Sequence, residues 1–291
     1  MEGLRAALAA LVVAVVAALA SASPAAAITG GTVDTTGRYA QVGLIAFYDG
    51  TGRYRCSAAL VSPTVLLTAA HCTEGTVGST AVTFLATVAE RPPSPLPAAA
   101  DPAAGYTASE LAAAGWLSGT AHTHPAYSGF TDLAHWNDVG VVVLDEPVAG
   151  LTPLPLAPTG YLDQFTPRVL NRTAFTAVGY GTEVRKAETG PQKPTPMSYP
   201  IVRRYTDSVG QKLTPQVLQA NGNPNDVRAG GGTCSGDSGG PVLHDGQVVA
   251  VVSYGYTANC RYLDGYQRVE VPVVQDWLAG FAVAAAERSA A

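Results

Sequence analysis

Three separated segments of this chain carry the residue types that acyl transfer by a serine requires. Residues 234–241 read Cys-Ser-Gly-Asp-Ser-Gly-Gly-Pro and offer Ser238 as a nucleophile. His71 lies far upstream, directly before a cysteine, and Asp138 lies between the two, directly before an apolar run. A serine hydroxyl is a weak nucleophile, so an adjacent base must take its proton and a third group must orient that base. The segments therefore predict that folding assembles Ser238, His71 and Asp138 into a catalytic triad.

The glycines around Ser238 predict the second requirement, a site for the oxyanion. We expect the backbone N–H groups of Gly236 and Ser238 to bind the developing negative charge. A side chain at position 236 would crowd the approaching carbonyl, which makes glycine suitable there. A simple turn would also use these glycines, but it does not explain why Asp237 and Ser238 lie among them. The remaining histidines are expected to be ordinary surface or core residues: His122, His124, His135 and His244.

The composition indicates an exported protein. The chain has 291 residues, and residues 1–27 resemble a secretory signal, in which Arg5 precedes the apolar run Ala6–Ala20 and small residues follow. The alternative is an uncleaved N-terminal anchor, but the run is short and rich in alanine. We expect removal of the signal, secretion to the extracellular space and no membrane association afterwards. A formal net charge of −5 gives no support for a nucleic-acid partner, which would need a basic patch.

Four cysteines in an exported chain predict two disulfides. They are Cys56, Cys72, Cys234 and Cys260, and the sequence alone allows three pairings. Pairing Cys56 with Cys72 and Cys234 with Cys260 would close two modest loops, and each bridge would stabilise the fold by about 2–4 kcal/mol. A metal site is the weaker alternative, because the sequence has no Cys-x-x-Cys motif and no Cys/His cluster with the spacing of a metal site.

Short apolar and β-rich runs separated by turn residues predict an all-β fold of the barrel or sandwich type. The runs are Val42–Tyr48, Cys56–Val61, Val65–Thr68, Val82–Val88, Val139–Leu144, Arg168–Leu170, Ala174–Tyr180, Val248–Ser253 and Tyr266–Val271. Two segments are expected to be helical, Ser109–Ala114 and Pro272–Glu287. The regions Glu90–Gly119 and Glu183–Gly232 interrupt the strand pattern and are expected to be long loops, as surface decoration or as binding surfaces.

These motifs resemble the trypsin/chymotrypsin family of serine endopeptidases over nearly all of residues 28–280. The matching features, in chain order, are Ile28–Gly31, Thr68–Cys72, His124-Pro125, Asn137–Leu144, Gly179–Thr182, Cys234–Pro241, Ser253–Gly255 and Gly265–Val269. The resemblance implies an all-β, chymotrypsin-like fold of two six-stranded antiparallel β-barrels with a C-terminal α-helix and the active site between the barrels. Residues 28–150 would form the first barrel, with His71 and Asp138. Residues 151–291 would form the second, with Ser238 and the helix.

The same resemblance implies an activation pair. In the family, the carboxylate directly before the nucleophile pairs with the α-amino group of a newly exposed Ile or Val, and the matching residues here are Asp237 and Ile28. No Lys or Arg precedes Ile28, so cleavage of the signal after Ala27 would expose it directly, with no zymogen stage. The rival cleavage site after Ala22 would leave a five-residue propeptide. Thr29 follows Ile28 where the family usually has Val.

Primary specificity remains open between two interpretations. By the resemblance, Gly232 lies at the base of the primary pocket, so a carboxylate from that position is absent. Ser253, Tyr254 and Gly255 match the segment that pairs with the substrate backbone as an added strand. Asp264 matches a pocket position that is commonly glycine, and its carboxylate could receive a Lys or Arg side chain. If Asp264 instead lies in an Asp-Gly turn and faces water, the pocket is open and apolar.

The leading hypothesis is a secreted serine endopeptidase that acts on protein or peptide substrates as a monomer. A catalytically inactive homologue that serves as a binding protein is the alternative, and the filled triad positions argue against it. An esterase of the α/β-hydrolase type would show Gly-x-Ser-x-Gly and the order Ser, Asp, His, whereas this chain has His, Asp, Ser. We expect no cofactor and no metal, since no oxygen-ligand loop for calcium is evident.

Overall fold

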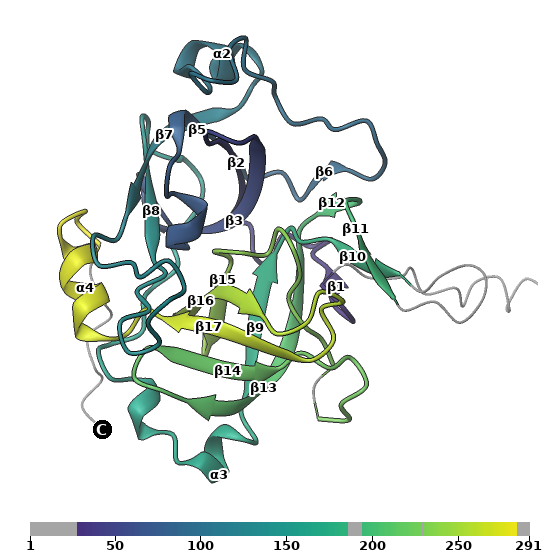
Figure 1. Ribbon diagram of the computed structural model, residues 1–291, viewed down its shortest axis with the longest axis vertical. Coiled ribbons are helices and arrows are strands. Elements are labelled where there is room, and N and C mark those ends of the chain that lie inside the picture. The colour runs from purple at the N-terminus through teal and green to yellow at the C-terminus, as the bar shows by residue number, and fades with distance from the viewer. Residues whose placement is uncertain (1–27, 186–193, 229, 284–291) are drawn as a thin grey trace, which may run out of the picture.

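The computed structural model describes residues 28–185, 194–228 and 230–283, so the expected signal at 1–27 lies outside the described residues. The first barrel closes six antiparallel strands in the order β2-β3-β4-β8-β7-β5 (Figure 1). Their bounds are β2 Val42–Tyr48, β3 Arg53–Ser62, β4 Val65–Thr68, β5 Val77–Thr83, β7 Leu117–Thr123 and β8 Gly140–Leu144.

The second barrel closes six antiparallel strands in the order β9-β13-β14-β17-β16-β15, because β13 pairs with both β14 and β9. Their bounds are β9 Ala174–Gly179, β13 Arg204–Leu213, β14 Val217–Asn221, β15 Pro241–His244, β16 Gln247–Gly255 and β17 Leu263–Arg268. Two small antiparallel pairs join β10 Glu183–Arg185 to β11 Thr195–Met197 and β6 Thr87–Ala89 to β12 Ile201–Val202. Two six-stranded antiparallel barrels confirm the predicted fold class.

Strand β2 shows how one strand builds both a barrel core and the junction between the barrels. Successive side chains of a strand point to opposite faces. Ile45 and Phe47 accordingly join the core of the first barrel, whereas Leu44 packs in the cluster between the barrels with Val178 and Tyr180 of the second half. Every residue of β2 is buried, which explains its unbroken apolar sequence.

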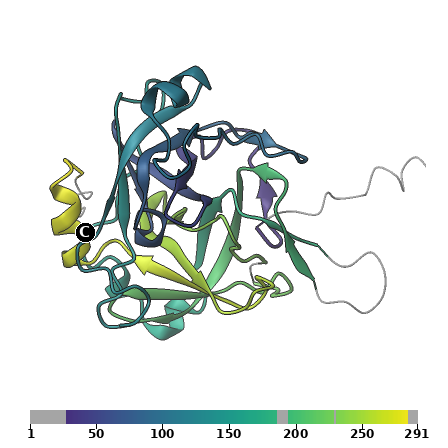
Figure 2. The same cartoon turned by 45° about the horizontal axis from the view of Figure 1, so that its top comes forward.

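Both ends of the described chain cross to the opposite barrel. Near the N-terminus, β1 (Thr32–Val33) pairs antiparallel with β13 of the second barrel. The C-terminal helix α4 (Pro272–Ala279) returns to the first barrel, where the Trp277 ring lies 5.0 Å from the His124 ring. Figure 2 shows this yellow helix beside the strands of the first barrel. The two barrels are thus fastened by segments from each end of the chain.

Three expectations about local structure are wrong. Arg168–Leu170 belongs to a helix, α3 (Pro167–Leu170), because Thr166 caps its N-terminus and Pro167 suits its first turn. The region Glu183–Gly232 is no loop, since β13 and β14 lie within it. Helix α4 ends at Ala279, followed by Gly280, and residues 284–287 of the expected helix lie outside the described residues.

The region Glu90–Gly119 is mostly irregular and includes a short helix, α2 (Ala108–Ala113). Its first turn is fixed by a capping box, in which Thr107 and Glu110 exchange hydrogen bonds between side chain and backbone. The remaining short helices are η1 (Ala70–Cys72) and η2 (Leu162–Gln164). Within the described part of the chain, no helix has the length and apolar character needed to span a membrane.

The two predicted disulfides are present and join Cys56 to Cys72 and Cys234 to Cys260. Of the three pairings that the sequence allows, this is the one that closes the two modest loops. The first bridge ties β3 to η1, and the second ties the segment before Ser238 to the loop between β16 and β17. Both bridges therefore restrain segments that carry predicted site residues.

Candidate active site

His71, which is partly exposed, and Asp138, which is buried, form a hydrogen-bonded pair in the first barrel. His71 lies in η1, which follows β4, and the neighbouring Cys72 anchors this turn to β3. Nδ1 of His71 lies 2.9 Å from Oδ2 of Asp138, and the backbone N–H of His71 donates to Oδ1 at 2.9 Å. With a proton on Nδ1 donated to the carboxylate, Nε2 of the neutral ring remains free to accept a proton.

Asp138 is 0% exposed, and its carboxylate and backbone are held by residues of the second barrel. Ser253 Oγ donates to Asp138 Oδ2 at 2.6 Å and in turn accepts a bond from Trp136 Nε1 at 2.9 Å. The Asp138 backbone N–H donates to Gln267 Oε1 at 3.0 Å. Ser253 was predicted to contact substrate, but its hydroxyl here positions the carboxylate. Sequence reasoning missed Trp136 and Gln267, because only the fold reveals their partners.

The segment 234–241 around Ser238, called here the predicted nucleophile loop, is fixed to the first barrel through Ser57 of β3. The Ser57 N–H donates to the Ser238 carbonyl at 2.8 Å, and Ser57 Oγ donates to the Gly236 carbonyl at 2.9 Å. The same hydroxyl accepts a bond from the Tyr180 N–H at 2.9 Å. One buried serine therefore sets the position of the loop from both sides of Asp237.

The backbone N–H groups of Gly236 and Ser238 are available for an oxyanion. Neither group donates to an acceptor among the described residues. Gly236 has φ +98°, a conformation that favours glycine, so the local geometry explains this residue. The hydrogen bonds of the described residues do not include one between His71 and Ser238, so the contact between base and nucleophile stays a prediction.

Asp237 is fully buried beneath the nucleophile loop. Its Oδ1 accepts from the Gly181 N–H at 2.7 Å and its Oδ2 from the Cys234 N–H at 2.9 Å. Burial raises the pKa of Asp237 to about 6, although these two N–H groups and the charges of Arg55 and Arg204 act in the opposite direction. A carboxylate in this setting is stabilised by any further cation that reaches it.

Ile28 is buried beside this region, but in the full chain its nitrogen belongs to a peptide bond with Ala27. The α-amino group required for an activation pair does not exist before that bond is cut. Next to Ile28, Thr29 and Gly232 exchange two backbone hydrogen bonds, of 2.9 and 3.0 Å. Gly232 is thus held in a backbone bridge and is not among the described residues that line the pocket beside Ser238.

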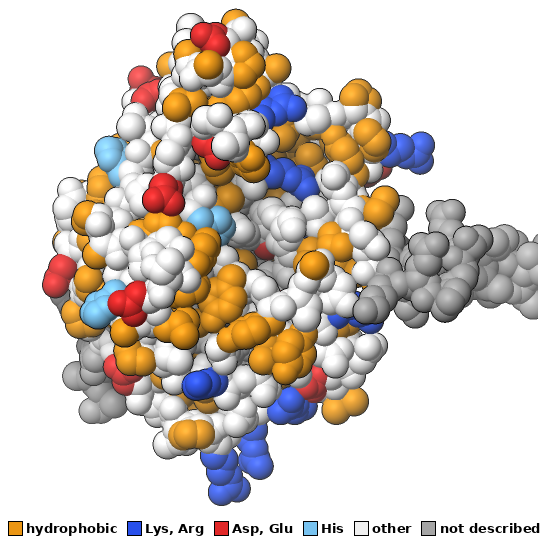
Figure 3. Space-filling view, in the orientation of Figure 1, with side chains coloured by type: hydrophobic (Ala, Val, Ile, Leu, Met, Phe, Trp, Pro, Cys, Tyr) orange, Lys and Arg blue, Asp and Glu red, His pale blue; other side chains and the backbone are white. Residues whose placement is uncertain are grey.

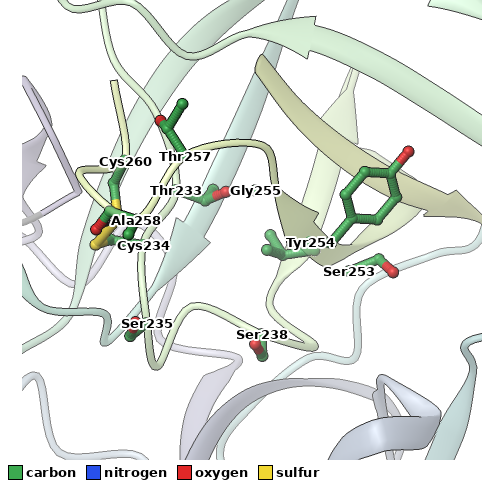
Figure 4. A pocket seen from close by; sticks show the side chains of 11 residues that line it. Thr233, Cys234, Ser235, Ser238, Ser253, Tyr254, Gly255, Thr257, Ala258 and Cys260 are labelled. Carbon is green, nitrogen blue, oxygen red and sulfur yellow. Dashed lines mark hydrogen bonds between the residues drawn. A yellow bond between two sulfur atoms is a disulfide. The ribbon is translucent and has the colours of Figure 1, made fainter. Parts of the chain in front are cut away.

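A pocket of about 430 Å³ opens beside Ser238. In Figure 4 the Cys234–Cys260 disulfide lies on one side of it and Tyr254 on the other, with Ser235 and Ser238 below. Ser253, Tyr254 and Gly255, predicted to contact substrate, all line this pocket.

A row of aromatic rings continues from the pocket to His71. The Trp136 ring lies 5.2 Å from both Tyr254 and Phe130, and the Phe130 ring lies 5.4 Å from that of His71. Phe130 is 43% exposed, so this row forms an apolar wall at the surface of the site. Sequence reasoning missed Phe130, which lies in a loop with no motif.

Asp264 lies in strand β17, and its carboxylate is buried behind the pocket wall rather than facing water. Oδ2 accepts from the Thr233 N–H at 2.7 Å and from the Tyr266 hydroxyl at 3.2 Å. Oδ1 faces Gly255, where a Cβ would lie 3.8 Å away. Burial raises the pKa of Asp264 to about 7, so the carboxyl titrates near neutral pH.

One cluster among the described residues has ligand atoms close enough together to hold a metal ion, formed by Cys56, His71 and Cys72. Its two cysteines are joined in a disulfide, and a disulfide sulfur is not the thiolate that metals require. The histidine is engaged by Asp138. The ligand atoms of this cluster are therefore already committed to the disulfide and to the His71–Asp138 pair.

Comparisons with known proteins agree with this geometry. The trypsin family model matches residues 103–278. Brachyurin of Leptuca pugilator is 28% identical over 234 residues, which are 77% of this chain and 86% of that protein. A trypsin-like protease of Streptomyces glaucescens is 28% identical over 239 residues, 78% of this chain and 72% of that protein.

Two solved structures share the fold. The structure of HL collagenase has a TM-score of 0.59 at 18% identity and covers 87% of this chain and 97% of its own. Human heparin binding protein has a TM-score of 0.54 at 16% identity, with coverages of 90% and 99%. At these identities the likeness concerns the fold alone.

The contribution of the Ser57 hydroxyl to the barrel junction can be tested by measuring the free energy of unfolding. Ser57→Ala removes the hydroxyl partner of the Tyr180 N–H and of the Gly236 carbonyl, both in the barrel junction. Each buried polar group that loses its partner costs about 1–3 kcal/mol, so we expect the free energy of unfolding in urea to fall by about 2–4 kcal/mol.

Ser62→Ala is the matched control, because this serine ends the same strand and its hydroxyl makes no hydrogen bond among the described residues. It should change stability by less than about 0.5 kcal/mol. Equal losses in the two variants would show that the Ser57 hydroxyl does not fix the nucleophile loop.

Proposed function

The chain belongs to the trypsin family, and we propose that it is a secreted serine endopeptidase that hydrolyses peptide bonds through an acyl-enzyme on Ser238. The observation that carries the proposal is the hydrogen-bonded His71–Asp138 pair, which belongs to the first barrel and whose aspartate is held by Ser253 and Gln267 of the second. We infer that an imidazole oriented in this way acts as the base that removes the proton from Ser238.

The proposed reaction uses these groups in turn. Ser238 Oγ attacks the scissile carbonyl while His71 Nε2 takes its proton, and Asp138 stabilises the resulting imidazolium. The N–H groups of Gly236 and Ser238 bind the oxyanion. His71 then gives the proton to the leaving amine, and a water molecule, activated by the same imidazole, hydrolyses the acyl-enzyme. The chain's own residues supply each step, so the proposal requires no cofactor.

A fluorophosphonate probe tests for an activated serine. We expect it to label the mature protein covalently, with no labelling of Ser238→Ala, because the probe reacts only with a serine whose proton is taken by a base. Asp138→Asn should lower kcat by about 10³–10⁴ through loss of the correct His71 tautomer.

Circular dichroism of each variant should show that it keeps the fold. A correctly folded mature protein that takes no label would instead favour the inactive homologue acting as a binding protein. Labelling that persists in Ser238→Ala would place the nucleophile elsewhere.

We propose that cleavage after Ala27 exposes Ile28 and that its α-amino group pairs with Asp237. Support comes from the full burial of Asp237, which raises its pKa to about 6 and leaves it stabilised by a further cation. Because Asp237 lies between the two oxyanion donors, such a pair would order them.

N-terminal sequencing of the secreted, active protein tests the activation pair. We expect the sequence to start at Ile28, and a precursor that keeps even one residue before Ile28 should have much lower kcat. The physical reason is that any residue before Ile28 turns the Ile28 nitrogen into an uncharged amide, so the positive charge is lost from the position where Asp237 is proposed to need it. A start at Ser23 in fully active protein would contradict the proposal.

We propose that Asp264 gives the primary pocket a preference for Lys or Arg. Its Oδ1 faces Gly255, and the absence of a side chain there leaves only a thin wall between the carboxylate and the pocket. The competing proposal is an apolar pocket in which Asp264 serves only to hold Thr233 and Tyr266.

The pH dependence of specificity separates these two interpretations. Two peptide nitroanilides that differ only in Lys or Leu before the scissile bond would be hydrolysed by the same proposed catalytic groups, so the ratio of their kcat/KM values isolates Asp264. With a pKa of about 7, the ionised fraction of Asp264 rises from about 0.1 at pH 6 to about 0.9 at pH 8. The Lys/Leu ratio should therefore rise with pH, by up to about ninefold.

Asp264→Asn should abolish the rise, whereas Asp245→Asn, in the exposed turn between β15 and β16, should keep it. A Lys/Leu ratio that is independent of pH in wild type and unchanged in Asp264→Asn would contradict the preference for Lys or Arg and support the apolar pocket.

The remaining proposals concern the protein's context. We propose that 1–27 is a signal peptide, that the mature protein acts outside the cell as a monomer, and that its substrates are proteins or peptides. We also propose division into residues 28–150 and 151–291, with β1 and α4 as the segments that cross between the halves.

A further inference from the structure

A second cavity, of about 460 Å³, lies on the other side of the nucleophile loop. Both this cavity and the pocket beside Ser238 are lined by Ser235, but the second cavity continues to Gly236 and to strand β3 instead of to Tyr254. The scissile carbonyl is expected at the N–H groups of Gly236 and Ser238. A substrate whose acyl side chain enters the first pocket must therefore carry its leaving group across the second cavity.

Two arginines of β3 line this cavity. Arg53 and Arg55 are two positions apart and so project from the same face of the strand. No Asp or Glu is among the described residues that line it. In Figure 3, basic side chains, coloured blue, lie above a hollow near the centre of the face shown. The cavity on the leaving-group side thus has a positive wall.

Arg55 has a hydrogen-bond donor that the fold does not use. Its Nη2 donates to the Ser198 carbonyl at 2.9 Å, which fixes the guanidinium across the cavity. Its Nε would lie 3.5 Å from a Cβ at Gly236, so the group lies directly beside the oxyanion loop. Nη1 is buried and has no hydrogen-bond partner among the described residues. A buried, charged donor without a partner favours an anionic acceptor.

Arg53 is more fully engaged. Its Nη1 donates to the carbonyls of Leu96 and Pro97 at 3.1 and 2.7 Å. These neutral acceptors leave the positive charge of the guanidinium uncompensated, so Arg53 adds to the field in the cavity. The carboxylate that acts on Arg55 is Asp237, which is buried behind Gly236. In the proposed mature enzyme, Asp237 is occupied by the α-amino group of Ile28.

We propose that this cavity recognises an acidic side chain that follows the scissile bond in the substrate, with Arg55 Nη1 as its hydrogen-bond donor and Arg53 as a supporting charge. The inference rests on the proposed endopeptidase function and adds a substrate class to it. The competing interpretation is structural, in which Arg55 serves only to anchor the segment around Ser198 to β3.

Internally quenched peptides test the proposal with the mature enzyme. Peptide pairs share one sequence up to the scissile bond and carry Glu or Gln at the first, second or third position after it. We expect kcat/KM for Glu to exceed that for Gln by about tenfold at one of these positions, with the ratio falling as salt is added. A nitroanilide with the same acyl part, which has no residue after the bond, reports catalysis separately.

Arg55→Met should reduce the Glu/Gln ratio to near one, and Arg55→Lys should restore part of it because the charge remains. Each ratio is taken within one enzyme, so a general loss of activity cancels. Arg53→Met should lower the ratio less, and it remains informative if Arg55→Met does not fold. Arg168→Met, an exposed arginine of α3, is the control for loss of one positive charge.

Two results would overturn the inference. One is a Glu/Gln ratio near one at all three positions while the nitroanilide is still hydrolysed. The other is a ratio that Arg55→Met and Arg53→Met leave unchanged. Failure to hydrolyse the nitroanilide, with no label on Ser238, would overturn the proposed endopeptidase function itself, so the two failures are distinguishable.

Discussion

The site depends first on the hydrogen bonds that Ser57 makes across the barrel junction. A nucleophile from the second barrel and a base from the first can meet only if the relative position of the barrels is fixed to a fraction of an ångström. Ser57 holds the carbonyls of Gly236 and Ser238 and the N–H of Tyr180, and Thr68 Oγ1 binds the Ser57 carbonyl in turn. The strand that leads toward His71 and the loop that carries Ser238 are thereby parts of one network.

Three buried carboxylates around this junction are stabilised in three different ways. Asp138 has a histidine ring, a hydroxyl and one backbone N–H group around its carboxylate. Asp237 has two backbone N–H groups and more distant arginines, and burial raises its pKa to about 6. Asp264 has one N–H and one phenol, and its pKa rises to about 7. A buried carboxylate with few charged partners is stabilised more strongly by an added cation. For Asp237 the proposed cation is the α-amino group exposed by cleavage, and for Asp264 it is a Lys or Arg side chain of the substrate.

The sequence was sufficient where structure is encoded locally. Continuous apolar runs such as that of β2 identified strands, and the cysteines identified the two disulfides. Strand β13 was not predicted because its buried positions include Arg204. This arginine forms an ion pair with Glu183, which lies 21 residues earlier in the chain. The roles of Gln267 and Trp136 were not predicted for a similar reason. Their hydrogen-bond partners, Asp138 and Ser253, are 129 and 117 residues away in the chain. Nothing near such residues in the sequence marks them.

The same argument explains why the cavity beside the predicted nucleophile loop has no sequence signature. Arg53 and Arg55 precede the apolar run Cys56–Val61 that predicted this strand, and their contacts with Ser198 and Gly236 arise only through the fold. Nη2 of Arg55 is held by the Ser198 carbonyl, while Nη1 of the same guanidinium is left without a partner among the described residues. A donor fixed in this way loses little conformational entropy when an acceptor arrives, which favours selective binding over general attraction.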